Sequence, residues 1–488
     1  MPAKSRGITL ISCRLGEPSA GFPPFGLMYL ASYMRRNNIS CEIKDFQADY
    51  GEALFFVDQL VDYILGSQFN IVGISIFSNS IPLVIKALGS PRLQKEDLIL
   101  ILGGPGVAAI EDDIATACPR LNHIVSGEGE IPLLKIVSSH LNREGEPKTV
   151  GSNGHSASTR VVALDDLPIP AWDLVDGARY SKTPLVTMRG CPFDCDFCDV
   201  KATWGKRVTF RSPENVMAEV EYIYRVLGRT HLRIVDDTLT VNRNHIKALC
   251  NLFIERRLPV TWTCFARIDT LDEAMMLMMS QAGCKGIYLG IESGDESILR
   301  DIRKPKLNET LLKRFSVALS LFRVTASFIW GFPMEEVSAF RESIDLAFAL
   351  ARLGHTSGGD INIQLHLLAP TVGSSLFEKF EPALFFSQDE PLSYLGGAPL
   401  NNFRGATEYD EIVQFIRDNK RLCAPFYCFQ SEEFETKSAL IRGRSIPQGS
   451  RMRIQERYRI SQKLSFIYRT SAQFRARRMR RSSQNEVS

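Results

Sequence analysis

The sequence predicts an α/β protein with two parallel sheets in series: an N-terminal doubly wound (Rossmann-like) domain and a partial (β/α)6 barrel, followed by a mostly helical C-terminal region. Short apolar, β-branched runs alternate with segments of helical periodicity, which is typical of buried parallel strands. A stretch rich in Gly, Ser, Asp and Pro divides this alternation into two series. With 488 residues and 44% hydrophobic content, the chain is long enough for two or three domains.

The first series predicts a doubly wound domain over residues 1–145. Its strands are expected at residues 8–12, 41–45, 71–77, 98–102 and 123–126. Its helices are expected at residues 26–37, 53–66, 81–88, 110–117 and 130–140. Residues 146–180 follow as an interdomain linker, because Pro168 and Pro170 remove helical options there.

The second series predicts a partial barrel of about six units over residues 181–375. Its strands are expected at residues 185–188, 232–235, 260–265, 286–290, 325–330 and 362–368. Its helices are expected at residues 213–226, 245–255, 272–281 and 309–321. Beyond that point the periodicity becomes irregular, so residues 376–488 are expected to form a helical region with a basic tail.

Composition limits the compartment and the partners. No stretch approaches the roughly 18 consecutive apolar residues of a membrane span, and the N-terminus lacks a signal-peptide pattern. We therefore expect a cytoplasmic protein without a membrane span, whose eleven cysteines are reduced. The net charge is only +3, although the C-terminal end is strongly basic. We interpret this tail as a solvated terminus rather than a nucleic-acid or membrane patch. Its arginines are Arg475, Arg477, Arg478, Arg480 and Arg481.

Three cysteines lie on one short loop directly after the first strand expected in the barrel, where active sites of such barrels form. Three and two residues separate Cys191, Cys195 and Cys198. One loop with this spacing can hold three corners of a four-iron cubane, whereas tetrahedral zinc takes a fourth ligand from elsewhere. No such ligand is evident, because Cys423 and Cys428 are distant and no histidine is near. The spacing predicts a [4Fe-4S] cluster with one iron free of protein ligands, and structural zinc is the alternative.

An iron without a protein ligand can chelate the amino and carboxylate groups of S-adenosylmethionine. An electron passed through the cluster then cleaves the sulfonium and yields a 5′-deoxyadenosyl radical. The remaining single cysteines lie in apolar runs and are interpreted as core residues. They are Cys13, Cys41, Cys118, Cys250, Cys264 and Cys284.

The cysteine loop resembles the signature of the radical S-adenosylmethionine superfamily, CxxxCΦxC, with Phe197 as the aromatic residue Φ. In that family the backbone of this residue lies against the adenine. The resemblance continues at later strand ends, in Val235-Asp236-Asp237-Thr238, Phe265-Ala266-Arg267-Ile268-Asp269, Gly290-Ile291-Glu292-Ser293-Gly294 and Trp330-Gly331-Phe332-Pro333. It implies S-adenosylmethionine contacts from Glu292 and Ser293, with Arg267 and Asp237 as further candidates. Barrel packing or helix capping is the alternative for each motif, because Asp236, Ser293 and Asp295 all precede helices; we favour function for Glu292 and weigh the two equally for Asp237.

The first domain resembles the cobalamin-binding domain that one large group of these enzymes carries. The resemblance rests on Pro23-Pro24-Phe25-Gly26-Leu27, Gly103-Gly104-Pro105 and Gly127-Glu128-Gly129-Glu130. The last two follow strands, and ligands of open sheets bind beyond the carboxyl ends of strands. Tight turns that open helices are the alternative. The expected cobalamin contacts are Phe77, Ser78, Gly103, Gly104, Pro105, Gly127, Glu128 and Gly129.

The usual source of a histidine ligand to cobalt is missing. Some cobalamin proteins supply this ligand from a DxHxxG motif, but the corresponding stretch begins Asp45-Phe46-Gln47, so Gln47 replaces the histidine. We therefore expect base-off cobalamin without a protein histidine, its lower face covered by the loop Ile76-Phe77-Ser78-Asn79.

The resemblance implies an enzyme that methylates an unactivated carbon of a metabolite or natural-product precursor. A cyclase or rearrangement enzyme without net methyl transfer is one alternative, and a non-catalytic cobalamin or redox sensor is another. The partners implied are a small-molecule substrate and an electron donor such as flavodoxin or ferredoxin. His366 lies in the last strand expected in the barrel, where we weigh a substrate contact and a core histidine equally.

Overall fold

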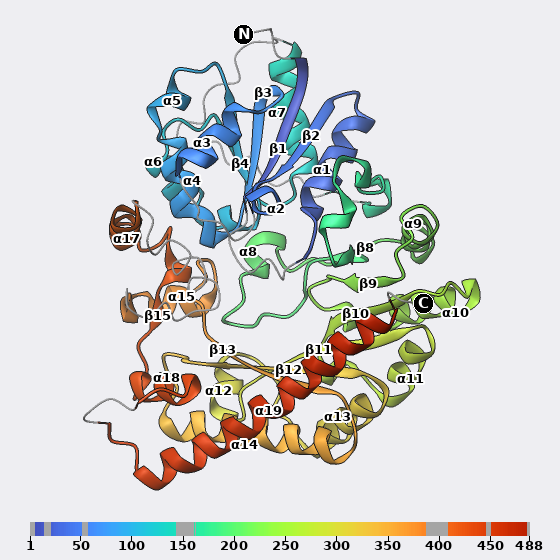
Figure 1. The fold of residues 1–488 in the computed structure, drawn as a ribbon, viewed down its shortest axis with the longest axis vertical. Helices are drawn as coiled ribbons and strands as arrows, with labels where there is room; N and C mark the ends of the chain where they lie inside the picture. The colour runs from blue at the N-terminus through green and yellow to red at the C-terminus, as the bar shows by residue number, and fades with distance from the viewer. Residues whose placement is uncertain are drawn as a thin grey trace.

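The computed structural model describes residues 5–13, 21–50, 57–142, 161, 163–386, 408–445 and 450–485. Two parallel sheets organise these residues (Figure 1), and the long last helix, α19 (Ile454–Asn485), lies along the second sheet. The predicted fold class is confirmed, with a doubly wound sheet followed by an open barrel.

The first sheet has five parallel strands in the order β2-β1-β3-β4-β5. The strands are β1 (Ser5–Cys13), β2 (Ser40–Asp45), β3 (Phe69–Ile76), β4 (Ile99–Gly103) and β5 (His123–Val125). The helices are α1 (Phe25–Arg36), α2 (Phe46–Tyr50), α3 (Val57–Leu65), α4 (Ile81–Leu88), α5 (Pro91–Gln94), α6 (Glu111–Ala117) and α7 (Glu130–Asn142). The strand order changes direction between β1 and β3, which is where sheets of this kind bind ligands.

The second sheet has six strands in the order β13-β12-β11-β10-β9-β6, all parallel, and it does not close into a ring. The strands are β6 (Thr183–Leu185), β9 (His231–Ile234), β10 (Thr261–Ala266), β11 (Cys284–Glu292), β12 (Arg323–Trp330) and β13 (Ile361–Leu367). The helices are α9 (Pro213–Arg225), α10 (Arg243–Arg256), α11 (Glu273–Gln281), α12 (Glu296–Asp301), α13 (Glu309–Leu321) and α14 (Val337–Thr356).

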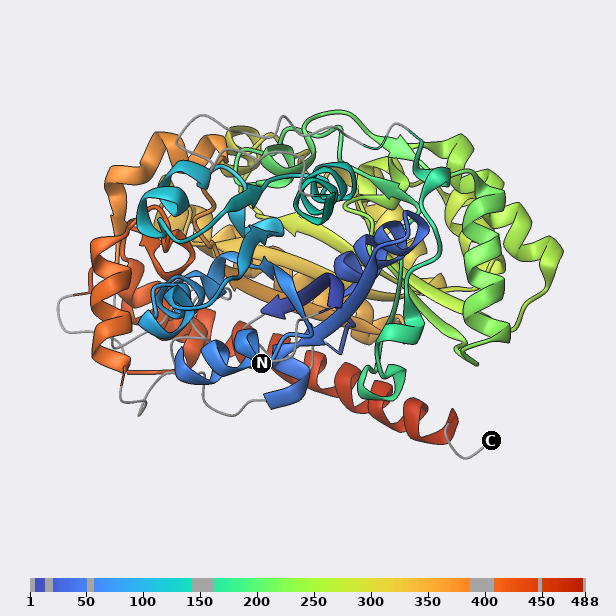
Figure 2. The same cartoon turned by 90° about the horizontal axis from the view of Figure 1, so that it is seen from above.

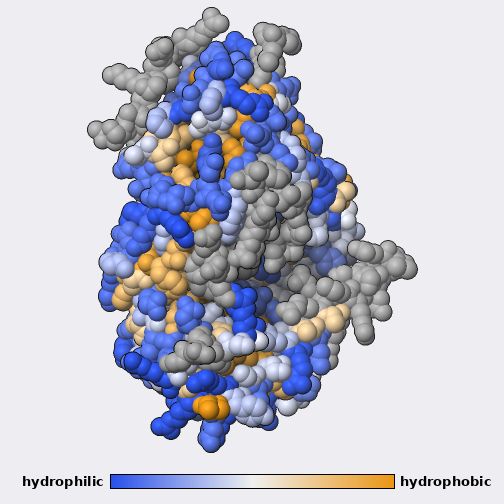
Figure 3. Space-filling view, turned by 60° about the vertical axis from the view of Figure 1, so that its left-hand side comes forward, coloured by the Kyte–Doolittle hydropathy of each residue, from blue (hydrophilic) through white to orange (hydrophobic). Residues whose placement is uncertain are grey.

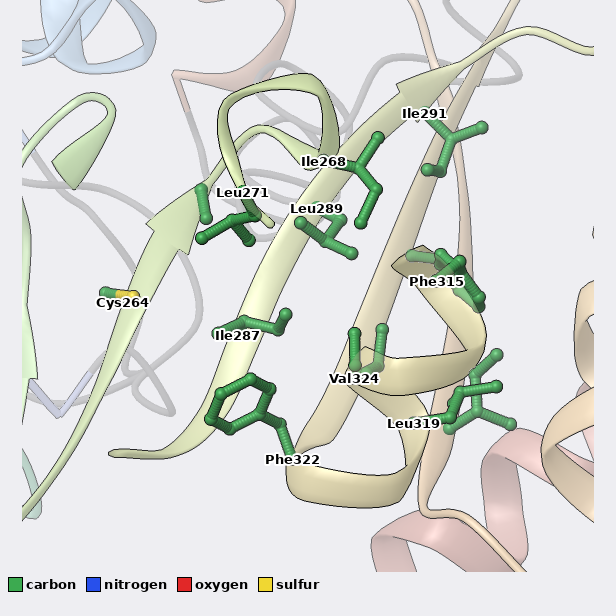
Figure 4. Close-up of a cluster of buried hydrophobic side chains, with 14 of the residues drawn as sticks. Cys264, Ile268, Leu271, Ile287, Leu289, Ile291, Phe315, Leu319, Phe322 and Val324 are labelled. Carbon is green, nitrogen blue, oxygen red and sulfur yellow. The ribbon is translucent and has the colours of Figure 1, made fainter. Parts of the chain in front are cut away.

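The largest hydrophobic core lies between this sheet and its helices. Figure 4 shows side chains of β10, β11 and β12 packed against Phe315 and Leu319 of α13. Cys264 is one of these side chains and is fully buried. All eleven cysteines are free thiols, and the predicted core cysteines are buried except for the half-buried Cys41. These thiols serve as small apolar residues.

Two parts of the barrel differ from the sequence prediction. No helix is predicted between residues 330 and 362, but α14 spans twenty residues there and buries Phe340, Ile344 and Ala347. The strand predicted at residues 185–188 ends at Leu185, and the chain then forms β7 (Met188–Arg189), antiparallel to β8 (Thr209–Phe210).

A buried carboxylate explains this early break in the strand. Asp236 accepts hydrogen bonds from the backbone N–H groups of Thr187 and Met188, at 2.8 and 3.2 Å, and from the Thr187 hydroxyl. These bonds take the place of ladder bonds and turn the chain toward β7. Burial raises the pKa of Asp236 to about 7.

The C-terminal region joins the two domains. Its elements are α15 (Ser375–Phe380), β14 (Leu384–Phe385), α17 (Tyr409–Asp418), β15 (Cys428–Phe429), α18 (Phe434–Arg442) and α19. Helix α17 packs on α4, so one hydrophobic core includes side chains of both. Helix α19 runs along one side of the molecule (Figure 2), where the Ser471 hydroxyl bonds the N–H and C=O groups of Ile363 on the edge strand β13. The side chains of the predicted basic tail lie outside the described residues.

Two surface properties bear on the partners. Among the described residues, no helix has both the length and the apolar character that crossing a membrane requires. On the face shown in Figure 3, hydrophobic side chains form separate groups among hydrophilic ones.

We expect the Asp236→Ala variant to lose about 2–3 kcal/mol of the free energy of unfolding, because buried donors lose their acceptor. The matched control, Asp236→Asn, keeps one acceptor oxygen and should lose less than about half of that. Urea unfolding of the cofactor-free protein measures both values. Equal losses in the two variants would contradict the role assigned to this side chain.

Candidate active site

The three cysteines predicted to hold a cluster lie on the loop between β7 and α8 (Val200–Trp204), and all three are partly exposed. The Cys191 Sγ lies 3.7 Å from the Thr238 hydroxyl, which follows β9. The loop therefore lies beyond the carboxyl ends of the barrel strands, where active sites of this architecture form.

The second half of the loop is fixed by the segment that follows β13. The backbone N–H of Leu376 donates to the Asp196 carbonyl at 2.8 Å, and the Thr371 hydroxyl donates to the Phe197 carbonyl at 3.1 Å. The Phe197 ring meets the Phe332 ring edge to face, at 6.2 Å between centroids. The backbone of the aromatic signature residue is thus held in place by a hydroxyl that the sequence analysis did not assign.

Arg267 lies against the loop from the end of β10. Its guanidinium donates to the Cys195 Sγ at 3.7 Å and stacks on the Phe193 ring, with 3.7 Å between Cζ and the ring centroid. Asp269 holds this guanidinium with two bonds, at 3.0 and 2.9 Å. The structure thus places Arg267 beside a sulfur of the loop, where a positive charge stabilises thiolates.

The thiols fit an iron-sulfur cluster when the positive charge of the iron favours their deprotonated form. In the ligand-free chain, burial raises the pKa of Cys198 to about 12 and also raises the pKa of Cys195, against the lowering effect of Lys304 and Arg267. In the described part of the chain, no three His, Cys, Asp or Glu side chains converge closely enough for a single metal ion. A bound cluster would deprotonate the thiols and draw them together.

Glu292 and Lys304 form a buried ion pair at the end of β11. Their charged atoms are 2.9 Å apart, and each side chain is less than 10% exposed. Glu292 adopts a left-handed backbone conformation, with φ of +69°, which is strained for a residue with a side chain. A Cβ atom on Gly290 would lie 2.2 Å from the Glu292 carboxylate, so this glycine makes room for it.

Lys304 of this ion pair lines a small cavity together with Arg267. Because Lys304, Arg267 and Glu292 all affect the pKa of Cys195, their charges lie close to its thiol. The cavity is lined by Arg267, Ile268, Asp269, Gly290, Ile291, Lys304, Pro305 and Leu307. A carboxylate and two cations beside the cluster loop suit an amino acid with a ribose. Lys304 was missed because its sequence signal, Arg303-Lys304-Pro305, lies outside the strand ends.

The other residues expected near S-adenosylmethionine are placed differently. The Ser293 hydroxyl is buried and bonds the Ser343 hydroxyl at 2.9 Å and the Asp295 N–H at 3.1 Å, which is a turn role. Asp237 is exposed and lies beside the backbone N–H of Gly190. His366 is half-buried and contacts Gln364 at 3.0 Å. Burial lowers the pKa of His366, and the nearby Glu292 carboxylate raises it in part.

The carboxyl edge of the first sheet carries the residues expected to contact cobalamin. Phe77 directly follows β3, and 43% of its surface is exposed, so it presents an apolar ring at this edge of the sheet. Ser78 begins the short turn η2 (Ser78–Ser80), and Pro105 begins η3 (Pro105–Val107) after β4. A Cβ atom on Gly103 would lie 3.1 Å from the Val125 carbonyl oxygen. Gln47 is buried within α2.

Gly104 and Glu128 have contacts that the sequence did not suggest. Gly104 has φ of +98°, and a Cβ atom there would lie 2.7 Å from the Ile76 carbonyl oxygen, so this glycine lets the loop after β4 pack against the backbone of Ile76, directly before Phe77. The Glu128 carboxylate accepts a bond from the Val161 N–H at 2.9 Å and pairs with Arg189 at 3.1 Å. This carboxylate therefore connects the two domains. Gly127, which precedes Glu128, has φ of +75°. A Cβ atom on Gly129, which follows Glu128, would lie 3.1 Å from a methyl carbon of Leu30.

Family models match both domains. A model of the radical SAM superfamily matches residues 185–347, and a model of the B12 binding domain matches residues 12–137. These matched segments contain the cysteine loop and the carboxyl edge of the first sheet.

Three curated relatives span most of the chain. An uncharacterized methyltransferase of Pyrococcus horikoshii is 28% identical over 348 residues, which are 67% of this chain and 74% of the relative. The cytidylyl-2-hydroxyethylphosphonate methyltransferase of Streptomyces wedmorensis is 25% identical over 468 residues, covering 80% and 84%. The anaerobic magnesium-protoporphyrin IX monomethyl ester cyclase of Rubrivivax gelatinosus is 25% identical over 361 residues, covering 68% and 63%.

Solved structures share the fold. The cobalamin-dependent S-adenosylmethionine radical enzyme OxsB, solved with aqua-cobalamin bound, aligns over 96% of this chain and 80% of its own, with a TM-score of 0.65 and 15% identity. The radical S-adenosylmethionine methyltransferase TsrM from Kitasatospora setae aligns over 78% and 80%, with a TM-score of 0.61 and 16% identity.

The fold and the two matched domains define a radical S-adenosylmethionine enzyme that carries a cobalamin-binding domain. The chain belongs to the cobalamin-binding radical S-adenosylmethionine enzymes, whose methyltransferases are among its relatives. Its cofactors are a [4Fe-4S] cluster, S-adenosylmethionine and cobalamin.

We expect the Lys304→Met variant to lose about 3–5 kcal/mol of the free energy of unfolding and to bind S-adenosylmethionine more weakly, because the Glu292 carboxylate stays buried without its cation. The control, Lys306→Met, breaks an exposed ion pair with Glu296 and should leave the free energy of unfolding nearly unchanged, because solvent screens exposed pairs. Urea unfolding and calorimetric titration of S-adenosylmethionine measure the two effects. Similar losses of the free energy of unfolding in both variants would contradict the claim that burial makes the pair of Glu292 and Lys304 important.

The Gly104→Val variant should bind hydroxocobalamin at least about tenfold more weakly, because strain of the order of 1–3 kcal/mol displaces the loop that carries Phe77. Gly228→Ala is the control, since Gly228 also has a positive φ, +64°, but faces open space. Absorbance titration of the corrin measures both affinities. Unchanged affinity in Gly104→Val would contradict the placement of the cofactor at this edge.

Proposed function

We propose that this chain transfers a methyl group to an unactivated carbon of a metabolite or natural-product precursor. The observation that carries the proposal is the close approach of α8, the helix that directly follows the cysteine loop, to the first domain. A Cβ atom on Gly373 would lie 2.9 Å from the Cβ atoms of both Ala109, in the first domain, and Ala202, in α8. A substrate held between the two domains would therefore face both cofactor sites at once.

When bound, the cluster and S-adenosylmethionine supply a radical that removes a hydrogen atom, and cobalamin supplies a transferable methyl group. The chain's own residues bind and orient these groups. Cys191, Cys195 and Cys198 would hold three irons, and Arg267 would donate a hydrogen bond to one of their sulfurs. The buried pair of Glu292 and Lys304 would fix the nucleoside and amino acid portions of S-adenosylmethionine.

The first domain contributes shape rather than charge to its cofactor. Phe77 would offer an apolar ring to the corrin, and because Gln47 replaces the histidine of the DxHxxG motif, we expect cobalamin in the base-off form. Packing of the two domains through α17 and Gly373 would keep water from the radical. His366, near Glu292 on strand β13, is a candidate substrate contact.

The names of the relatives support methyl transfer, since those from Pyrococcus horikoshii and Streptomyces wedmorensis are called methyltransferases. A second candidate is ring closure without net methyl transfer, because the relative from Rubrivivax gelatinosus is named as a cyclase. Both reactions need an external one-electron source, for which we propose a flavodoxin or ferredoxin. A reducing, cytoplasmic compartment suits such a donor and eleven free thiols.

Product analysis separates these two reactions. Anaerobic protein reconstituted with iron, sulfide and hydroxocobalamin is incubated with S-adenosylmethionine, a reductant and candidate substrates, and its nucleoside products are counted. A methylase forms S-adenosylhomocysteine together with 5′-deoxyadenosine, whereas a cyclase forms only the second. Formation of neither product with any reductant would refute the proposal.

We expect Cys191→Ala, Cys195→Ala and Cys198→Ala each to lower the iron content well below four per chain and 5′-deoxyadenosine formation to background, because a cubane needs all three thiolates. The control is Cys41→Ala, which removes a half-buried thiol of the first domain and should retain four irons. Iron and sulfide analysis measures the outcome. Full iron content in a variant of the loop would contradict the ligand assignment.

A further inference from the structure

A buried ion triad joins the stem of the cysteine loop to the first domain. Arg189 ends β7, two residues before Cys191, and its guanidinium pairs with Glu128 at 3.1 Å and with Glu130 at 2.6 Å. The three side chains are 10%, 1% and 4% exposed, respectively. Both carboxylates come from the segment that connects β5 to the first turn of α7. The triad therefore bridges two domains that are far apart in sequence.

Aromatic rings enclose the cation of this triad. The Arg189 guanidinium carbon lies 5.8 Å from the Tyr29 ring centroid and 5.6 Å from that of Trp204. The Tyr29 hydroxyl in turn bonds Glu219, which pairs with Arg211 at 2.6 Å. Arg211 follows β8, the antiparallel partner of β7, and donates to the Val186 carbonyl. Both strands at the base of the cysteine loop are thus tied to α1 of the first domain.

Burial makes this arrangement unusual among the contacts between the first domain and later residues. Arg35 with Asp173 and Arg179 with Asp49 also join the first domain to later residues, but their side chains are 37–58% exposed. Exposed pairs contribute little to stability, whereas a buried pair repays its desolvation only in one geometry. A buried triad therefore fixes position more than it adds stability.

The position that the triad fixes bears on function, because the segment that carries Glu128 and Glu130 lies next to both the proposed cobalamin site and the cysteine loop. Residues 127–129 lie at the carboxyl edge of the first sheet, where we place cobalamin, and the Glu128 and Glu130 side chains reach the base of the cysteine loop. A ligand that orders this segment would also order the carboxylates that hold Arg189.

We propose that Arg189 is a positioning residue that couples occupancy of the cobalamin site to the order of the cysteine loop. The inference rests on the proposed function, since it needs cobalamin at the edge of the first sheet. Coupling of this kind between two binding sites is worth about 5–150-fold in equilibrium constants. Corrin binding should therefore slow amide hydrogen exchange in residues 186–199 at least about fivefold.

The test uses the full chain reconstituted with iron and sulfide, and compares hydrogen exchange of peptides spanning residues 186–199 with and without hydroxocobalamin. Wild-type protein should show the slowing. Arg189→Met should bind one corrin per chain but lose the slowing, and Arg189→Lys should recover part of it, because an amine reaches one carboxylate. The control, Arg35→Met, removes an exposed arginine that joins the first domain to later residues and should behave as wild type.

A second variant distinguishes a loss of coupling from a loss of folding. Glu130→Gln keeps the shape of the triad and removes one charge, and it should reduce the slowing while circular dichroism and corrin content stay unchanged. Equal slowing in wild type, Arg189→Met and Glu130→Gln would overturn the inference and leave the proposed function intact. A wild-type chain that binds no corrin would overturn both.

Discussion

The structure depends on the placement of one loop of eight residues, 191–198, between two domains. Because three thiols must reach one cluster, this loop cannot follow a regular helix or strand, and contacts from elsewhere must define its shape. Asp236 turns the chain into the loop, Arg267 contacts its middle, and Thr371 holds its end. Each of these residues lies after a strand of the barrel, so the open sheet sets the position of the loop.

Buried charge is the recurring means by which this position is defined. Glu292 with Lys304, Arg189 with its two carboxylates, and Arg211 with Glu219 all lie away from water. Such pairs are weak sources of net stability, but they penalise every misplaced geometry. The strained backbone of Glu292 and the missing side chain of Gly290 fit the same account, because both serve to place one carboxylate beside the cluster loop.

Local sequence predicted the strands and the cysteine loop well, since β-branched runs and ligand spacing are properties of neighbouring residues. It did not identify α14, although Phe340, Ile344 and Ala347 have helical spacing. It also did not show that Glu128, an expected cobalamin contact, pairs with a residue 61 positions away. Thr371 and Lys304 were missed for the same reason, because their roles arise from tertiary contacts. The Ser293 hydroxyl accepts a bond from the Asp295 N–H, and its contact with S-adenosylmethionine stays a prediction from the motif.

The central claim is that three thiolates leave one iron of the cluster open to S-adenosylmethionine. Its most direct test is magnetic resonance of the reduced cluster with S-adenosylmethionine isotopically labelled at its amino nitrogen. The account predicts a hyperfine coupling between that nitrogen and the cluster, which changes from a nitrogen-15 to a nitrogen-14 pattern when the label is omitted. A cluster without this coupling, with a fourth protein ligand in its place, would contradict the account.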